Sequence, residues 1–252
     1  MSRIQRKFLI VGVQRTGSSA LAEMIDTHPA IAVGWEWTEH TPFLKKLAQL
    51  QSNLAGDFDA LRPAQRDHIN NSLTQDTEVL GFRRLFGASH LWVAHPRYSA
   101  KLFYDRFDAH LNWLRANSDV RLIHILRDNH ISWIKSKFVT RAAGNYVGET
   151  HPEDMQITVP LGEAVARVRS KVWIDEQLAQ LQSTNDYLAI PYEKFATCLP
   201  ELAQQAAQFL GCQPNLIQPQ LTDIRKQSTK PDSDYIKNYA ELESALHQAL
   251  NT

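Results

Sequence analysis

Cysteine is nearly absent from this sequence of 252 residues, in which Cys198 and Cys212 are the only two. Their spacing matches no metal-ligand motif, and two cysteines are too few to build a disulfide framework. Low cysteine content is typical of proteins that work in a reducing compartment. We therefore expect a cytoplasmic protein that does not depend on disulfides.

Long apolar runs and a charge excess are also missing. No stretch of 18 apolar residues occurs, and the opening MSRIQRK has no apolar segment of the signal-peptide type. Lys plus Arg and Asp plus Glu number 27 each, so the overall charge suggests neither a nucleic-acid nor a membrane partner. We expect a soluble, unprocessed chain in which any basic site is local.

A phosphate-loop pattern occupies residues 8–21, FLIVGVQRTGSSAL. Apolar residues interrupted only at Gly12 are typical of a buried strand, and a polar turn with an apolar-periodic helix pattern follows them. Gly12 and Gly17 have the spacing of a Walker A loop, but Ser18 stands where the lysine belongs and Ser19 takes the Ser/Thr position. The pattern predicts a strand, a phosphate loop without its lysine, and a helix.

Such a loop can hold one tetrahedral anion. The backbone N–H groups of residues 15–19 and the positive end of the helix would point at the bound group. The missing lysine is the charge that reaches β- and γ-phosphates. Arg15 and the hydroxyls of Thr16, Ser18 and Ser19 remain, and they suit a phosphate that carries one further transferable oxyanion. The alternative is a Ser/Gly-rich turn that only caps a core helix.

The run QRTGSSALAEMIDTHPAIAVGWEWT, residues 14–38, closely resembles the start of sulfotransferases. These enzymes move a sulfuryl group from 3′-phosphoadenosine 5′-phosphosulfate to an acceptor hydroxyl or amine. The run looks most like the tyrosylprotein and bacterial carbohydrate branches, whose loop usually reads P-R-S-G-T-T. The substitutions in this chain keep the hydroxyls. The resemblance implies that the donor is bound by five loop residues, Arg15, Thr16, Gly17, Ser18 and Ser19.

The resemblance also implies a catalytic base. The tyrosylprotein branch has a glutamate at the position of Glu36, after a similar D-x-H-P-x-x-x-x-G sequence. A carboxylate can take the proton of an acceptor hydroxyl as the O–S bond forms. Glu39 is the second candidate, and His28 and His40 are rival bases, although His28 more simply closes the helix. A surface glutamate without a catalytic role is the alternative for Glu36.

Residues 120–138, VRLIHILRDNHISWIKSKF, predict another strand, turn and helix. The apolar run ends before Arg127, and His124 inside it is most simply a core residue. In sulfotransferases an Arg at this strand end and a Ser about two turns into the helix hold the 3′-phosphate, which suits guanidinium and hydroxyl chemistry. Arg127 matches the Arg, unless it only pairs with Asp128. The helix positions that match are Ser136 and, as alternatives, Lys135 and Ser132.

Two later segments complete the donor site that the resemblance implies. Tyr192 follows a strand expected at residues 187–190 and either approaches the adenine, as in the relatives, or packs as a strand-end aromatic. The C-terminal tail, residues 221–252, resembles the last nucleotide-binding segment of the family. Its candidates for contacting the 3′-phosphate or the ribose are Lys226, Ser228 and Lys237.

Other segments are expected to build the acceptor side. A strand at residues 79–82 leads to Arg83 and Arg84, one of which stands where the family often has a lysine. We expect both to solvate the strand end or to meet the acceptor. Residues 141–160 lack periodicity and are interpreted as an acceptor-side loop. Three tryptophans either stack on the acceptor or pack in the core: Trp35, Trp37 and Trp133.

Strand and helix patterns alternate around the phosphate loop. This order predicts an α/β fold, a three-layer P-loop-type domain with a mostly parallel central sheet and ligands at the carboxyl ends of its strands. With 43% hydrophobic residues, residues 1–252 can bury the core of one domain. Residues 161–182 predict a long amphipathic helix. Its charged residues are expected to face solvent: Arg167, Arg169 and Lys171.

Together these features predict a sulfotransferase that uses 3′-phosphoadenosine 5′-phosphosulfate and needs no metal. Glu36 would act as the base in an in-line transfer, and Arg15 would stabilise the developing charge. A carbohydrate or small metabolite is the favoured acceptor. One alternative is a P-loop kinase that uses a nucleoside triphosphate, against which the missing lysine and the lack of a clear Walker B carboxylate count. The other is a non-catalytic nucleotide-binding protein of the same fold.

Overall fold

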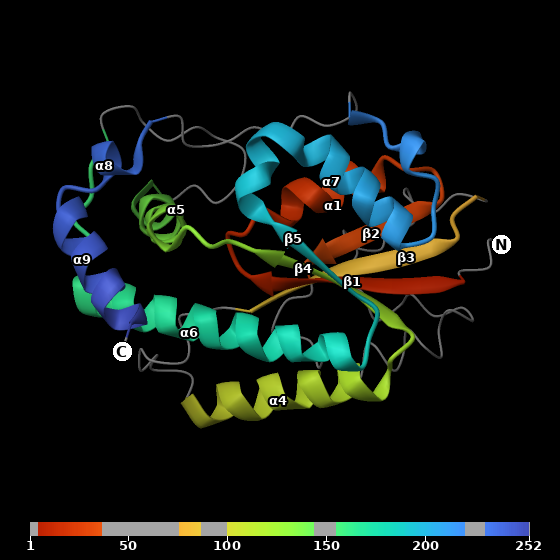
Figure 1. Ribbon diagram of the computed structural model, residues 1–252, viewed down its shortest axis with the longest axis horizontal. Helices are drawn as coiled ribbons and strands as arrows, with labels where there is room; N and C mark the ends of the chain where they lie inside the picture. Colours follow the sequence, from red (N-terminus) through yellow and green to blue (C-terminus); the bar gives the residue numbers. More distant parts are fainter. Residues whose placement is uncertain (1–4, 37–75, 87–99, 144–154, 220–229, 252) are drawn as a thin grey trace.

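The structure is a computed structural model that describes residues 5–36, 76–86, 100–143, 155–219 and 230–251 (Figure 1). Strands and helices alternate along the chain. The strands are β1 (Arg6–Val13), β2 (Ile31–Glu36), β3 (Val79–Phe86), β4 (Val120–Leu126) and β5 (Tyr187–Pro191). The helices are α1 (Ser18–Asp26), α4 (Ala100–Ala116), α5 (His130–Ala143), α6 (Leu161–Ala179), α7 (Phe195–Phe209), α8 (Asp232–Tyr235) and α9 (Tyr239–Leu250).

Among the described residues, five strands form one sheet in the order β2-β3-β1-β4-β5. Every neighbouring pair is parallel, and β1 lies at the centre, where Leu9 is opposite Phe82 of β3 and Leu122 of β4. A parallel sheet covered on both faces needs strands that are apolar almost throughout. The run at residues 8–13 meets that need, and the predicted α/β fold with a mostly parallel sheet is confirmed.

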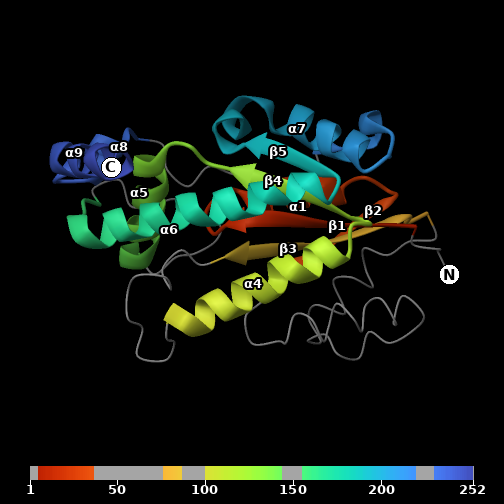
Figure 2. The same cartoon turned by 60° about the horizontal axis from the view of Figure 1, so that its bottom comes forward.

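Helices cover both faces of the sheet, so the described part has three layers (Figures 1 and 2). On one face, α1 and α7 pack over Phe8 and Ile10 of β1. On the other face, α4 and α6 pack over Leu9 and Val11. Because successive side chains of a strand point to opposite faces, this one strand supplies both halves of the core.

Helix α5 lies at the carboxyl ends of the strands, and α8 and α9 lie on its other side (Figure 1). Lys135 of α5 is buried, and its Nζ pairs with Asp232 Oδ1 of α8 at 2.5 Å. Ile157, which precedes α6, forms a parallel β-bridge with Ile236 after α8. These contacts fasten the C-terminal helices to the end of the molecule where ligands bind in parallel α/β sheets.

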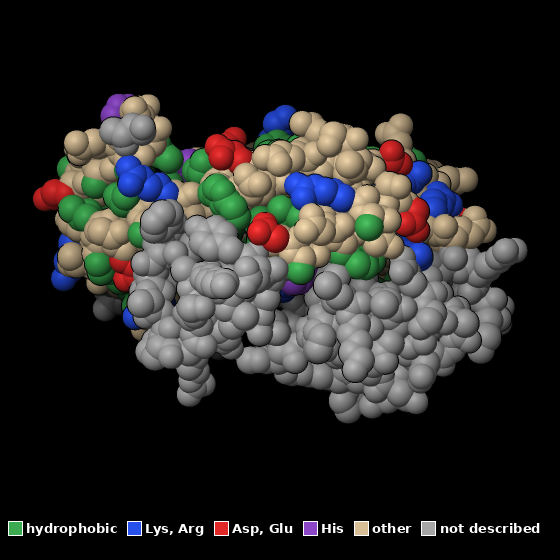
Figure 3. All heavy atoms as spheres, turned by 90° about the horizontal axis from the view of Figure 1, so that it is seen from below, with side chains coloured by type: hydrophobic (Ala, Val, Ile, Leu, Met, Phe, Trp, Pro, Cys, Tyr) green, Lys and Arg blue, Asp and Glu red, His purple; other side chains and the backbone are tan. Residues whose placement is uncertain are grey.

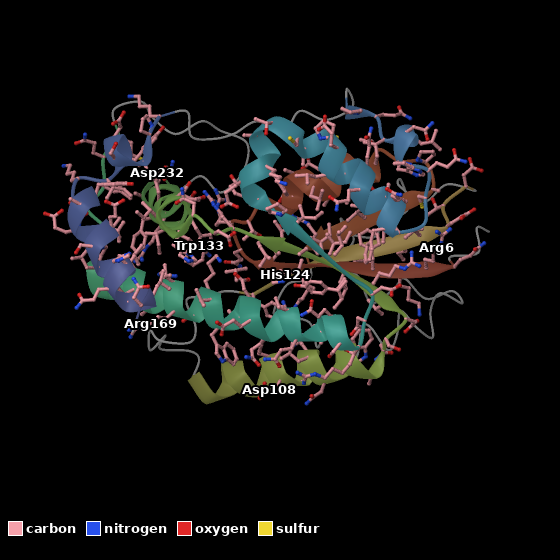
Figure 4. All side chains as sticks on the ribbon, viewed as in Figure 1. Arg6, Asp108, His124, Trp133, Arg169 and Asp232 are labelled. Atoms are coloured by element: carbon pink, nitrogen blue, oxygen red, sulfur yellow. The ribbon has the colours of Figure 1, made fainter. Side chains whose placement is uncertain are left out.

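One expectation about α6 is wrong, because Lys171 is only 2% exposed. Its Nζ pairs with Asp175 Oδ2 at 2.6 Å, and Asp175 Oδ1 lies 3.1 Å from His124 Nε2 of β4. The other ring nitrogen of His124 lies 2.5 Å from the hydroxyl of Tyr187. His124, labelled in Figure 4, is in the core, as predicted, but it belongs to a polar network between α6 and the sheet. Arg169 is exposed, as predicted.

Two surface features bear on partners. No helix in the described ranges is long and apolar enough to cross a bilayer. On the face drawn in Figure 3, the described Lys and Arg side chains are interspersed with Asp and Glu. Equal numbers of basic and acidic residues would produce such a surface.

Candidate anion-binding site

The loop between β1 and α1, residues 14–17, has backbone angles that favour glycine. Gly17 has φ +80°, and a Cβ added to it would lie 2.8 Å from the ring of Tyr192. Gly12 lies before the loop, inside β1; it has φ +148°, and a Cβ there would lie 3.0 Å from the carbonyl oxygen of Ile125. Of the two glycines that suggested a phosphate loop, Gly17 is therefore needed for the turn, and both are needed for the close approach of their neighbours.

The N-terminus of α1 is available for an anion. Gly17 precedes the helix and has no side chain to cap it, and no acidic residue lies in the first turn. The first N–H groups of a helix need acceptors, and a phosphate supplies them. Thr16 is fully buried, and its hydroxyl donates to the carbonyl of Val13 at 2.8 Å. That hydroxyl therefore shapes the turn, while the hydroxyl-bearing Ser19, in the first turn of α1, is exposed.

Arg15 extends from the loop toward α5. Its Nε donates to Ser136 Oγ at 3.1 Å, and its Nη2 donates to Thr140 Oγ1 at 3.0 Å. The sequence assigned Arg15 and Ser136 to two different phosphates, and the structure joins them directly. Thr140 was not predicted, although its position one turn after Ser136 places both hydroxyls on one face of the helix.

Arg127 follows β4 and also binds the loop. Its Nη1 donates to the backbone carbonyl of Arg15 at 2.8 Å, and its Nη2 donates to Ser132 Oγ at 2.7 Å. The guanidinium carbon lies 4.2 Å from the centre of the Tyr192 ring. Among the described residues Arg127 Nε is buried without a hydrogen-bond partner. Burial lowers the pKa of Arg127 from its ordinary value, but an arginine remains charged in proteins.

The structure distinguishes the three helix positions that the sequence offered for the 3′-phosphate. Lys135 pairs with Asp232 and lies 5.1 Å from the ring centre of Tyr235, so its ammonium points toward α8. Ser136 binds Arg15, and Ser132 binds Arg127. The two serines therefore face the loop, whereas the lysine fastens α5 to the C-terminal segment.

Two more cations contact the loop. Arg83 donates from Nη1 to Ser19 Oγ at 2.5 Å, in the first turn of α1 next to the loop. It lies inside β3, which continues to Phe86, and not at a strand end as predicted. Lys137 of α5 donates to Gln14 Oε1 at 3.1 Å and was not predicted. One turn earlier, Trp133 Nε1 donates to the carbonyl of Gln14 at 2.9 Å. The fully buried Trp133 holds the loop and cannot stack on an acceptor (Figure 4).

Glu36, the expected base, is the last residue of β2. Its backbone pairs with Arg83 of β3 after a register shift that begins at Val33. Its side chain lies outside the described part of the structure, and so do four other candidates in full: Glu39, His40, Lys226 and Ser228.

Two further candidates lie in the described part. His28 has a packing role, because its Nδ1 accepts from the N–H of Ala30 and its Nε2 lies 2.9 Å from the carbonyl of Gln213. Lys237 is exposed, and its backbone N–H donates to Ile157.

Hence the described site offers one uncapped helix N-terminus and four surrounding cations, Arg15, Arg83, Arg127 and Lys137. In the described ranges no three His, Cys, Asp or Glu side chains are grouped so that they could hold a metal ion. Backbone amides and guanidinium groups bind phosphate and sulfate groups through charge-assisted hydrogen bonds. The arrangement can therefore hold a ligand with more than one anionic group.

Comparison with known proteins identifies a family. A sequence model of the sulfotransferase family matches residues 8–215. A sulfotransferase from Alicyclobacillus acidocaldarius is 16% identical, with a TM-score of 0.47, and the alignment covers 96% of each chain. The sulfotransferase domain of the olefin synthase of Synechococcus PCC 7002 is 13% identical, with a TM-score of 0.45, and 100% of this chain and 95% of that domain align. No curated protein matches the sequence.

Proposed function

Because the chain belongs to the sulfotransferase family, we propose that its donor is 3′-phosphoadenosine 5′-phosphosulfate, held with the phosphosulfate at the loop around Arg15. The observation that carries the proposal is the contact between the two predicted anion sites, in which Arg127 Nη1 donates to the carbonyl of Arg15 at 2.8 Å. A ribose with phosphates at its 3′ and 5′ positions needs two cationic sites close together, and this contact supplies them.

The described residues fit such a donor. The uncapped first turn of α1 and the guanidinium of Arg15 suit the phosphosulfate. The buried Nε of Arg127 lacks a partner among the described residues, and a 3′-phosphate oxygen would satisfy it. Tyr192 lies against both Gly17 and Arg127, so its ring is beside the loop, and this supports Tyr192 as the proposed contact for the adenine. Three further donor contacts are proposed from the resemblance alone: Lys226, Ser228 and Lys237.

In the proposed reaction Glu36 takes the proton of an acceptor hydroxyl. The donor supplies the sulfuryl group, because its S–O bond to the 5′-phosphate breaks as the acceptor oxygen bonds to sulfur. Arg15 and the N–H groups of the loop stabilise the negative charge that grows on the departing phosphate. The β2–β3 register supports this role, because Glu36 pairs with Arg83, whose guanidinium reaches Ser19.

A carbohydrate or a small metabolite with a hydroxyl group is the proposed acceptor. Trp35 and Trp37 are the neighbours of Glu36 in sequence and are the proposed stacking residues for a sugar ring. Residues 141–160 are the proposed acceptor-side loop.

Calorimetric titration of the purified protein with adenosine 3′,5′-bisphosphate, and separately with ATP, tests the proposal. Both titrations contain EDTA, so that binding through magnesium is removed. We expect the bisphosphate to bind and ATP to bind weakly or not at all, because the loop lacks the lysine that reaches a γ-phosphate. Absence of bisphosphate binding, with ATP binding restored by magnesium, would contradict the proposal and favour a kinase.

A further inference from the structure

The backbone of Arg15 has an unusual conformation. Its φ is +71°, and it is the only residue other than glycine with a positive φ in the described ranges. L-residues rarely adopt this region, because Cβ approaches the backbone too closely, and they remain there only when the surroundings hold them. The residue proposed to stabilise the departing phosphate therefore needs an external contact that fixes its main chain.

Arg127 makes that contact. Its Nη1 donates to the carbonyl of Arg15 at 2.8 Å, and this bond joins a charged donor to a carbonyl at a site where Arg127 is only 4% exposed. Charge-assisted hydrogen bonds are stronger than neutral ones, and a low local dielectric strengthens them further. The bond therefore opposes the tendency of Arg15 to relax into an ordinary conformation.

Arg127 is itself fixed by two neighbours. Its Nη2 donates to Ser132 Oγ at 2.7 Å, and Asn129 Oδ1 accepts from the backbone N–H of Ser132 at 2.8 Å at the start of α5. Its guanidinium also lies over the ring of Tyr192, 4.2 Å from the ring centre. A guanidinium has five N–H donors. Two of those of Arg127, one on each terminal nitrogen, already donate to the protein, so this side chain holds the loop in addition to any ligand that it binds.

The direction of the carbonyl matters for anion binding. In a planar trans peptide the C=O of one residue and the N–H of the next point in opposite directions. When Arg127 holds the carbonyl of Arg15, it turns the N–H of Thr16 away from itself. We propose that Arg127 is a positioning residue, which keeps Arg15 and the loop amides in the conformation that binds the 5′-phosphosulfate, in addition to any contact with the 3′-phosphate. This inference rests on the proposed donor.

Two nucleotides distinguish the positioning role of Arg127 from a direct contact with the 3′-phosphate. Adenosine 3′,5′-bisphosphate carries both phosphates, whereas adenosine 5′-phosphate lacks the 3′-phosphate and depends on the loop. Each would be titrated calorimetrically into wild type and Arg127→Ala. Positioning predicts that the substitution weakens both nucleotides by at least tenfold. An unchanged affinity for adenosine 5′-phosphate, with only the bisphosphate weakened, would overturn the inference and leave Arg127 as a ligand of the 3′-phosphate alone.

Arg127→Lys is the milder second variant. It keeps the positive charge, but one ammonium cannot reproduce the two divergent bonds to Arg15 and Ser132. We expect it to bind adenosine 5′-phosphate more weakly than wild type does. Full wild-type affinity in this variant would contradict the inference, because a positive charge without the two bonds would then be enough for nucleotide binding.

Arg121→Ala is the matched control. Arg121 lies on the same strand, β4, and its Nη1 donates to the carbonyl of Phe209 at 2.8 Å, but it lies near the amino end. This variant also loses a guanidinium that binds a backbone carbonyl, yet it should keep the wild-type affinity for both nucleotides. A loss equal to that of Arg127→Ala would show a general effect on the fold and would overturn the inference.

Hydrogen exchange in the absence of nucleotide tests the positioning role of Arg127 without assuming the proposed donor. The indole N–H of Trp133 donates to the carbonyl of Gln14, the residue before Arg15, so its hydrogen exchange reports on the loop. We expect Arg127→Ala to speed this exchange at least tenfold while Arg121→Ala leaves it unchanged; equal exchange in wild type and Arg127→Ala would refute positioning. If wild type binds neither nucleotide, the proposed function fails, and the exchange rates still decide the role of Arg127.

Discussion

Glu36 carries the proposed proton transfer from its place at the end of β2. Replacement by Gln removes the base while keeping the size of the side chain. We expect turnover to fall by ~10²- to 10⁴-fold. The rate would be measured with an acceptor found in a screen of sugars and small hydroxyl compounds. Affinity for adenosine 3′,5′-bisphosphate should not change, and near-wild-type turnover in a folded Glu36→Gln protein would refute the role.

His28 gives a prediction about pH. Its Nδ1 accepts from the N–H of Ala30 at 3.1 Å, which requires a neutral ring, so its Nε2–H donates to the carbonyl of Gln213. Burial lowers the pKa of His28 below its ordinary value of 6.5. In the unfolded chain His28 takes up a proton more readily, so its stabilising contribution is present above pH 6.5 and is lost as the pH falls below it.

The measurement is urea denaturation at pH 7.5 and pH 5.5 for wild type and His28→Gln. Gln can still accept from Ala30 and donate to Gln213, but it does not titrate. The free energy of unfolding should therefore fall less between the two pH values in the variant than in wild type. An equal fall in both proteins would show that His28 does not contribute to the pH dependence of the free energy of unfolding.

At the level of secondary structure, the polar network between α6 and β4 gives a prediction about stability. Lys171→Met leaves the carboxylate of Asp175 buried without its counter-charge, and losing one partner of a buried ion pair costs about 3–5 kcal/mol. Adding Asp175→Asn should recover most of the loss, because an amide oxygen can still accept from His124 without a charge. Urea denaturation would measure the free energy of unfolding of wild type, of Lys171→Met and of the double variant.

The control for this prediction is Arg169→Met, which removes an exposed cation from the same helix. Exposed substitutions usually change the free energy of unfolding by less than about 0.5 kcal/mol. A loss in Lys171→Met no larger than in this control, or a double variant less stable than Lys171→Met, would show that the buried charges do not determine the effect.

The sequence predicted the positions of strands and helices better than the contacts between them. The strands predicted at residues 79–82 and within 120–126 follow from apolar runs, because a strand buried on both faces has a local signature. The first strand is longer than predicted, because β3 continues through Arg83 and Arg84 to Phe86. The buried position of Lys171 could not be predicted in this way. Its i,i+4 pairing with Asp175 is visible in the sequence, but the contact of Asp175 with His124 joins residues 51 positions apart and depends on how α6 packs on the sheet.

In the candidate site, too, features set by neighbouring residues were predicted, and contacts between distant segments were not. The glycine spacing predicted the loop, and the strand-end position predicted Arg127, because both are set within a few residues. Local spacing could not decide between Lys135 and Ser136, because neighbours on a helix face directions about 100° apart and the choice depends on where α5 docks. Thr140 was missed for the same reason, since its contact with Arg15 spans 125 positions.

At the scale of the whole molecule, α5 connects the loop to the C-terminal helices. On one side it holds Gln14 and Arg15, and on the other its Lys135 pairs with Asp232. Asp232→Asn leaves the buried ammonium of Lys135 without its counter-charge, which should cost up to about 3–5 kcal/mol. We expect faster amide hydrogen exchange in residues 230–251, because this pair fastens α8 to α5.

Asp234→Asn is the matched control, because this carboxylate lies in the same short helix and is exposed. Its amide exchange should match that of wild type. Exchange in residues 230–251 that is unchanged by Asp232→Asn would show that the apolar contacts of α9 suffice to hold the C-terminal helices.

The position of the loop in the chain has a consequence for synthesis. The ribosome makes residues 14–19 more than a hundred residues before it makes the side chains that fix them: Trp133, Ser136, Thr140 and Arg127. Tyr192, against which Gly17 packs, is made later still. A nascent chain therefore carries the phosphate-loop sequence long before the side chains that hold the loop exist, and the loop can reach its folded conformation only after Tyr192 has been synthesised.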